Sequence, residues 1–330
     1  MKNKRYAICL LCSILCCGLI AVSGLMLGSR FISPAEIIKI IFAKTDSVNS
    51  GIFYYSRLPR VTASLLSGAA LAVSGAVLQN VLSNKLASPS IIGVNAGAGF
   101  GVTLCCSLGI ISGWAVSAFA FGGSLIAVIL LSLFASRTNA SKTTVILGGV
   151  ALNSILGAFS ESLSVLDNDV AMLTTEFRVG GFSAVSYTRL LPAAVMILTA
   201  LLILFTLFNE LDIVALGDET AKSVGLKAKK FRMLFLALSA LLAGAAVSFS
   251  GLLGFVGLIV PHFVRKFTGN ESRKLLPLSA VAGGGFVCLC DTLSRLLFKP
   301  YELPVGILMS LIGGPVFVVM LVRMKGGYKK

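Results

Sequence analysis

Long apolar stretches recur along the whole chain and constrain its fold more than any other feature. Runs of roughly 18 residues are long enough, at about 1.5 Å per residue, to cross a bilayer core of about 30 Å as a helix. Of the 330 residues, 56% are hydrophobic and 12% are charged, which is about half the charged fraction of a typical soluble domain. The sequence therefore predicts an all-α polytopic membrane protein surrounded by membrane lipid.

Glycine, proline and charge clusters divide the apolar sequence into ten candidate spans. The eighth is short and rich in Gly and Pro, so nine spans remain an alternative. The first begins after Lys2, Lys4 and Arg5 and is too long for the apolar core of a signal peptide, which has about 7–15 residues. The ten spans cover residues 6–28, 61–82, 92–110, 115–135, 143–164, 191–208, 231–250, 253–266, 276–297 and 306–323.

The formal net charge of +15 does not indicate nucleic acid, because the basic residues form short clusters between spans and not one basic face. With the N-terminus in the cytoplasm, roughly two thirds of the 28 lysines and arginines fall on the cytoplasmic side, as the positive-inside rule requires. We expect a multi-pass protein of the cytoplasmic membrane with both termini inside.

Two segments of the chain resemble each other. Residues 65–82 and 241–258 align without gaps and share Leu-Leu, Gly-Ala-Ala, Ser-Gly and a final Leu. Small residues are common at helix contacts in membranes, so composition alone is an alternative explanation. If the repeat is real, its copies begin on spans two and seven and are inverted, which is a recurrent transporter design.

Charged residues near the outer boundary form two patterns. Arg57 and Arg60 open span two, where they oppose both the positive-inside rule and the helix dipole. Either an external anionic partner or lipid phosphate explains them. Asp291 and Arg295 lie four residues apart on one helix face and are expected to pair.

The longest inner polar segment, residues 209–232, predicts a short capped helix over Asp218 to Val224, closed by Gly225. Such a helix either docks a soluble partner or is part of a solvated loop.

No metal, cofactor or catalytic site is predicted. His262 is the only histidine, and four of the eight cysteines lie in the first apolar segment without acidic neighbours. The chain has no G-x-x-x-x-G-K-[ST] phosphate loop, so it does not hydrolyse ATP by that route. The absence of mid-span acidic residues argues against an ion-coupled secondary transporter, which remains the less favoured alternative.

Several segments resemble the FecCD-type permeases of binding-protein-dependent ABC importers for iron-siderophores, haem and vitamin B12. They occur in the family's order along nearly the whole chain. The matching segments are RLPRVTASLLSGAALAVSGAVLQNVLSNKLASPSIIGVNAGAG, ILGGVALNS, ALGDETAKSVGL, GFVGLIVPHFVRKFTG and DTLSRLLFKPYELPVGILMSLIGGPVFVVML.

The resemblance implies a single permease domain over residues 1–330, of the type II importer kind, with repeat-like halves at about 61–164 and 231–323. The implied function is import of an iron-siderophore or related chelate by alternating access, with haem or cobalamin as alternatives. The implied partners are a second permease copy or paralogue, cytoplasmic ATPases and an extracytoplasmic binding protein. ATP hydrolysis belongs to the ATPases, so the permease itself is not an enzyme.

The resemblance also assigns roles to residues at three sites. Arg57, Arg60 and Arg295 match arginines that receive glutamates of the binding protein, which is chemically suited to guanidinium groups. The ATPase coupling loop matches Leu216, Gly217, Asp218, Glu219, Ala221 and Gly225. The inner gate matches Asn84, Leu86, Lys142 and Thr143, and Lys142 departs from the family's pattern because it is bulkier and charged.

Overall fold

The computed structural model describes residues 2–28, 30–43, 47–138, 141–298 and 301–326. Within these ranges the chain is helical and contains no strand. The helices are α1 Lys2–Met26, α2 Pro34–Ala43, α3 Val48–Ile52, a π-helical turn Phe53–Arg57, α4 Leu58–Val81, α5 Val94–Ser107, α6 Gly113–Arg137, α7 Lys142–Leu166, α8 Asn168–Val179, α9 Tyr187–Thr206, α10 Phe208–Leu216, α11 Asp218–Ser223, α12 Ala228–Ser250, α13 Val256–Thr268, α14 Ser272–Leu296 and α15 Val305–Gly326.

Each of the ten predicted spans contains one long or apolar helix, so the predicted all-α membrane fold is confirmed. Among the described residues, seven helices have the length and hydropathy to cross a bilayer, and α5 and part of α15 are shorter apolar helices. The eighth span corresponds to α13, whose 13 residues extend only about 20 Å as a helix. That length is less than the bilayer core, in line with the doubt raised by its sequence.

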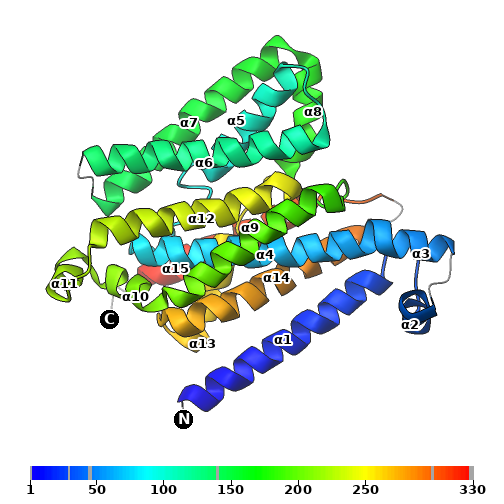
Figure 1. The fold of residues 1–330 in the computed structure, drawn as a ribbon, viewed down its shortest axis with the longest axis horizontal. Helices are drawn as coiled ribbons and strands as arrows, with labels where there is room; N and C mark the ends of the chain where they lie inside the picture. Colours follow the sequence, from blue (N-terminus) through cyan, green and yellow to red (C-terminus); the bar gives the residue numbers. More distant parts are fainter. Residues whose placement is uncertain (1, 29, 44–46, 139–140, 299–300, 327–330) are drawn as a thin grey trace.

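The helices form a bundle with α4 near its centre (Figure 1). α4 packs between α12 and α14, α1 lies along the outside of α14, and α5 to α8 form a layer on the opposite side. The start of α1, the end of α15, α10 and α11 all lie at the left end in Figure 1, which we call the α10–α11 end. The opposite end, where α3 joins α4, is called the arginine end.

Small residues allow α4 to approach its neighbours closely. A Cβ atom added to Gly68 would overlap the backbone of Gly283 in α14, and the reverse substitution would overlap Gly68. One added to Gly75 would overlap the carbonyl oxygen of Gly257 in α13. Close backbone contact through small residues is a common way to pack helices in membranes, where the hydrophobic effect contributes little.

The two similar segments do not fold alike throughout. Residues 65–81 are helical in α4, whereas the second copy leaves the helix at Gly251, whose φ of +66° favours glycine. Gly251 aligns with Gly75, so the copies diverge at that glycine. An inverted relation between the halves at 61–164 and 231–323 stays a prediction.

The predicted start of span two is wrong. The helix begins at Val48 and continues through the π-helical turn into α4, so Arg57 and Arg60 are not at a helix N-terminus. In a π-helix the N–H of residue 59 would bond to the carbonyl of Tyr54. Pro59 has no N–H, so this carbonyl is free to accept another bond. The Tyr187 hydroxyl donates to that carbonyl at 2.9 Å. The helix dipole therefore does not disfavour the two arginines, and this part of the argument for an external anionic partner no longer applies.

Candidate functional sites

An ion-pair cluster joins α4, α14 and the α14–α15 loop at the arginine end. Arg60 Nε lies 2.9 Å from Asp291 Oδ1, and Arg60 Nη1 lies 2.8 Å from Glu302 Oε2. Arg295 Nη2 lies 3.2 Å from Asp291 Oδ2, so the predicted i,i+4 pair is present. Asp291 is fully buried, whereas the Glu302 side chain is 44% exposed. The cluster thus combines a buried carboxylate with one that faces the surface.

The other two predicted docking arginines bond the end of α1. Arg57 Nη1 donates to the carbonyls of Leu25 and Met26, at 2.7 and 2.6 Å. Arg295 Nη1 donates to the carbonyls of Gly24 and Leu27, at 3.3 and 3.1 Å. The last carbonyls of a helix have no intrahelical partner, so these guanidinium groups cap α1.

Of the three arginines, Arg60 has the most direct route to a partner at the surface. Arg57 and Arg295 are each only 4% exposed and are bonded to backbone. The Nη1 group of Arg60 donates to the half-exposed Glu302, which was not predicted as a site residue. In the sequence, Glu302 is a lone carboxylate in the turn before α15, and no local pattern links it to Arg60, 242 residues away.

The predicted short helix at the opposite end is present as α11, between two glycines with positive φ, Gly217 at +114° and Gly225 at +78°. Leu216 is 71% exposed and Glu219 is also exposed, so both are available to a partner. Ala221 is fully buried and is placed instead in the packing beneath α11. The side chain of Asp218 lies outside the described residues.

The predicted gate residues lie beside this element. Ser83, with φ of +48°, follows the end of α4, and the Asn84 N–H donates to the Gln79 carbonyl at 3.1 Å. Asn84 Oδ1 accepts from the Leu86 N–H at 2.9 Å. Lys142 Nζ donates to Ser83 Oγ at 2.7 Å, so the structure brings the 83–86 turn and the start of α7 together. Thr143 is exposed next to Lys142.

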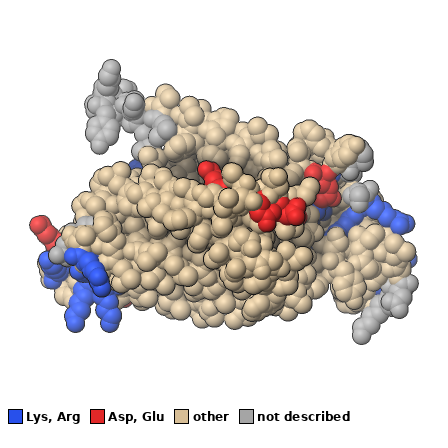
Figure 2. Space-filling view, turned by 90° about the horizontal axis from the view of Figure 1, so that it is seen from above, with Lys and Arg blue, Asp and Glu red and all other residues tan. Residues whose placement is uncertain are grey.

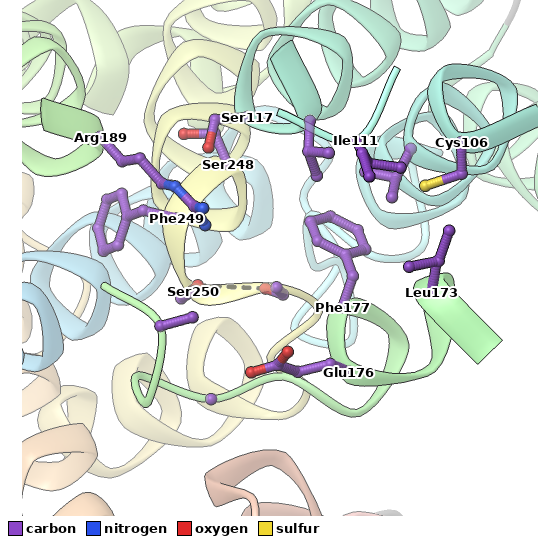
Figure 3. Close-up of a pocket in the computed structure, with 15 residues that line it drawn as sticks. Cys106, Ile111, Ser117, Leu173, Glu176, Phe177, Arg189, Ser248, Phe249 and Ser250 are labelled. Atoms are coloured by element: carbon purple, nitrogen blue, oxygen red, sulfur yellow. Dashed lines mark hydrogen bonds between the residues drawn. The ribbon is translucent and has the colours of Figure 1, made fainter. Parts of the chain in front are cut away.

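A cavity of about 150 Å³ lies among α5, α6, α8, α9 and α12 (Figure 3). Arg189 and Glu176 enter it from different elements, and Glu176 Oε1 accepts from Ser183 Oγ at 3.0 Å. Pockets for drug-sized ligands have volumes of about 300–1,000 Å³. The cavity is therefore too small for a metal chelate.

The layer of α5 to α8 presents an apolar surface interrupted by acidic residues. Leu147, Val150, Ile155 and Phe159 of α7 are exposed. Exposed acidic residues of α7, α8 and their junction are Glu161, Asp167, Asp169 and Glu176. Figure 2 looks onto this side and shows acidic side chains gathered around its middle and right, with basic side chains toward the two ends. Of these four residues, only Glu161 falls within a predicted span, where a carboxylate is costly against lipid.

Comparison with known proteins agrees with this architecture. Residues 12–323 match the FecCD transport family. The Fe(3+)-citrate import system permease protein YfmE of Bacillus subtilis is 32% identical, over 97% of this chain and 96% of that protein. The hemin transport system permease protein HmuU of Yersinia pestis is 34% identical, over 82% of each.

A solved structure described as the inward-facing conformation of a metal-chelate type ABC transporter also superposes on the chain. The TM-score is 0.86 at 31% identity, covering 95% of this chain and 98% of the other. The family match over residues 12–323 includes the residues of the arginine cluster, the gate turn and the α10–α11 element. The chain is therefore a membrane permease of the ABC importer kind, and it belongs to the FecCD transport family.

Proposed function

We propose that this permease imports an iron-siderophore by alternating access, with haem and cobalamin as the alternative cargoes. A binding protein docks at the arginine end, and ATPases engage α10 and α11 at the other end. ATP binding and hydrolysis then shift the population of inward- and outward-open states. The observation that carries the proposal is the exposed Leu216 beside α11, at the same end as the gate turn.

The proposed orientation places the α10–α11 end in the cytoplasm, together with the start of α1 and the end of α15. The clustering of lysines and arginines in the connections at that end supports it by the positive-inside rule. The proposed second permease copy covers α7, since its exposed face carries the carboxylate of Glu161 among apolar residues. A neighbouring protein accommodates a carboxylate better than lipid does.

Replacing Leu216 by Asp is expected to weaken association with the ATPase by at least about tenfold, because an apolar anchor is removed from the contact. Association is measured by co-purification and by titrating ATPase onto permease in nanodiscs, and transport by ATP-dependent uptake of a ferric hydroxamate into proteoliposomes. The matched control is Leu108→Asp, at a residue that is 61% exposed after α5, at the arginine end. Equal ATPase affinity in Leu216→Asp and wild type would contradict the proposed coupling site.

Replacing Glu302 by Gln is expected to raise affinity for the binding protein about tenfold, since Glu302 competes with a docking carboxylate for Arg60 Nη1. Affinity is measured by surface plasmon resonance on permease in nanodiscs, at low and at physiological salt. The paired variant Arg60→Gln is expected to lower affinity and to make the Glu302 substitution neutral. An unchanged affinity in both variants would remove Arg60 from the docking surface.

A further inference from the structure

A carboxylate of α10 caps a different helix. Both oxygens of Asp212 accept from the Ser272 backbone N–H, Oδ1 at 3.1 Å and Oδ2 at 3.2 Å. Ser272 is the first residue of α14 and is fully buried. The N-cap residue, Glu271, makes no side-chain capping bond. Asp212 therefore satisfies one of the free N–H groups at the start of α14, where the helix dipole favours a carboxylate.

The same contact extends to α4 and α13. Asn80 Nδ2 donates to Ser272 Oγ at 2.9 Å, and Asn80 Oδ1 accepts from Arg265 Nη2, also at 2.9 Å. Ser83 Oγ donates to the carbonyl of Ala215 in α10 at 3.2 Å. Asp212, Asn80 and Arg265 line one cavity of about 370 Å³. A single polar cluster thus joins α10 to the ends of α4 and α13 and to the start of α14.

α14 links this cluster to the arginine end. From Ser272 to Asp291 the helix is unbroken, and it covers about 28 Å at 1.5 Å per residue. Its middle is in backbone contact with α4 at Gly283 and Gly68. Pro277 removes one backbone bond near the start of α14, but the helix continues through it. If α14 moves as one packed element, a displacement at Ser272 reaches Asp291 and Arg295.

Asp212 is suited to a test that separates charge from shape. Burial raises the pKa of the Asp212 carboxyl, and its hydrogen bonds with Ser272 offset part of that effect. Asparagine has nearly the same size and retains one acceptor oxygen, but it loses the charge and the second acceptor.

We propose that Asp212 is a positioning residue that fastens α10 and α11 to the start of α14, so that movement of this element by an ATPase moves the helix that carries Asp291 and Arg295. The inference deepens the proposed function and rests on it. It assigns to Asp212, which has no family-derived role here, the task of joining the two ends of the importer.

The test uses the complete importer in nanodiscs, comparing wild type, Asp212→Asn and Glu271→Gln. Glu271 is the adjacent control, an exposed carboxylate whose partner is Lys274 at 2.6 Å. In Asp212→Asn, we expect the ratio of binding-protein-stimulated to basal ATP hydrolysis to fall about tenfold. In Glu271→Gln, this ratio should stay at the wild-type level. Unchanged stimulation in Asp212→Asn, or an equal loss in the control, overturns the proposal.

A second measurement does not depend on transport. In the purified permease, hydrogen exchange of the first-turn amides of α14 is expected to be about tenfold faster in Asp212→Asn than in wild type. Unchanged exchange overturns the positioning role. If exchange changes but wild-type ATP hydrolysis does not respond to the binding protein, the Asp212 contact stands and the proposed importer function fails.

Discussion

Replacing Asp291 by Asn is expected to destabilise the permease by about 3–5 kcal/mol, the usual cost of leaving a buried charge without its partner. Asp291 is fully buried and holds two guanidinium groups, those of Arg60 and Arg295. The amide retains the shape of the carboxylate but has no negative charge and places an NH₂ group opposite a cation. Thermal unfolding in detergent, followed by loss of monodisperse protein, measures the effect.

Glu302→Gln is the matched control, because Glu302 also pairs with Arg60 but is partly exposed. Exposed ion pairs contribute about 0–1 kcal/mol, so this variant should unfold close to the wild-type temperature. The contrast tests burial as the cause, since both substitutions remove one carboxylate from the same arginine. Equal destabilisation by the two variants would show that the buried Asp291 pair contributes no more to stability than the exposed Glu302 pair.

The Asp291 contacts also show what local sequence can reveal. The pair of Asp291 and Arg295 follows from their spacing of four residues on one helix face, and it is present. The contact between Arg60 and Asp291 joins residues 231 positions apart, and no local pattern encodes it. The same holds for the capping of α1 by Arg57, because a carbonyl acceptor carries no side-chain signature.

Hydropathy predicted the spanning helices because every backbone group in a bilayer needs an internal partner, which makes long apolar runs helical. It failed where tertiary contacts change the helix. Arg57 to Arg60 reads as a helix start because proline favours the first turn, yet the chain accommodates Pro59 with a π-helical turn and the Tyr187 hydroxyl. The short helices α2 and α8 were missed because each is too short for a membrane signal.

The short helix of the coupling element was predicted from the sequence, but the contact that joins this element to α14 was not. Gly225, with positive φ, closes α11 as the sequence pattern indicated, and Gly217, also with positive φ, precedes the helix. Asp212 lay within the same polar segment, but its role depends on Ser272, sixty residues further along the chain. Burial likewise separates Ala221 from its exposed neighbours, a distinction that composition cannot make.

The second large effect is expected from Gly75→Ala, the smallest substitution that adds a Cβ at the crossing of α4 and α13. That atom would overlap the carbonyl oxygen of Gly257, and backbone cannot move aside as a flexible side chain can. Overpacking a well-packed contact costs about 1–3 kcal/mol, and occasionally more. We expect at least about 3 kcal/mol here, since the two helices must separate. The measurement is the same thermal unfolding assay, with yield of folded permease as a second readout.

Gly18→Ala in α1 isolates the steric term, because a Cβ atom at Gly18 meets no other atom within 4 Å. Both substitutions exchange glycine for alanine inside a helix, so any gain in helix propensity is shared. The difference between the two variants therefore reports the α4–α13 contact alone. If Gly75→Ala unfolds at the same temperature as Gly18→Ala, α13 is not held against α4 at this crossing. The short eighth span would then have to be positioned by its contacts with α14 and α15.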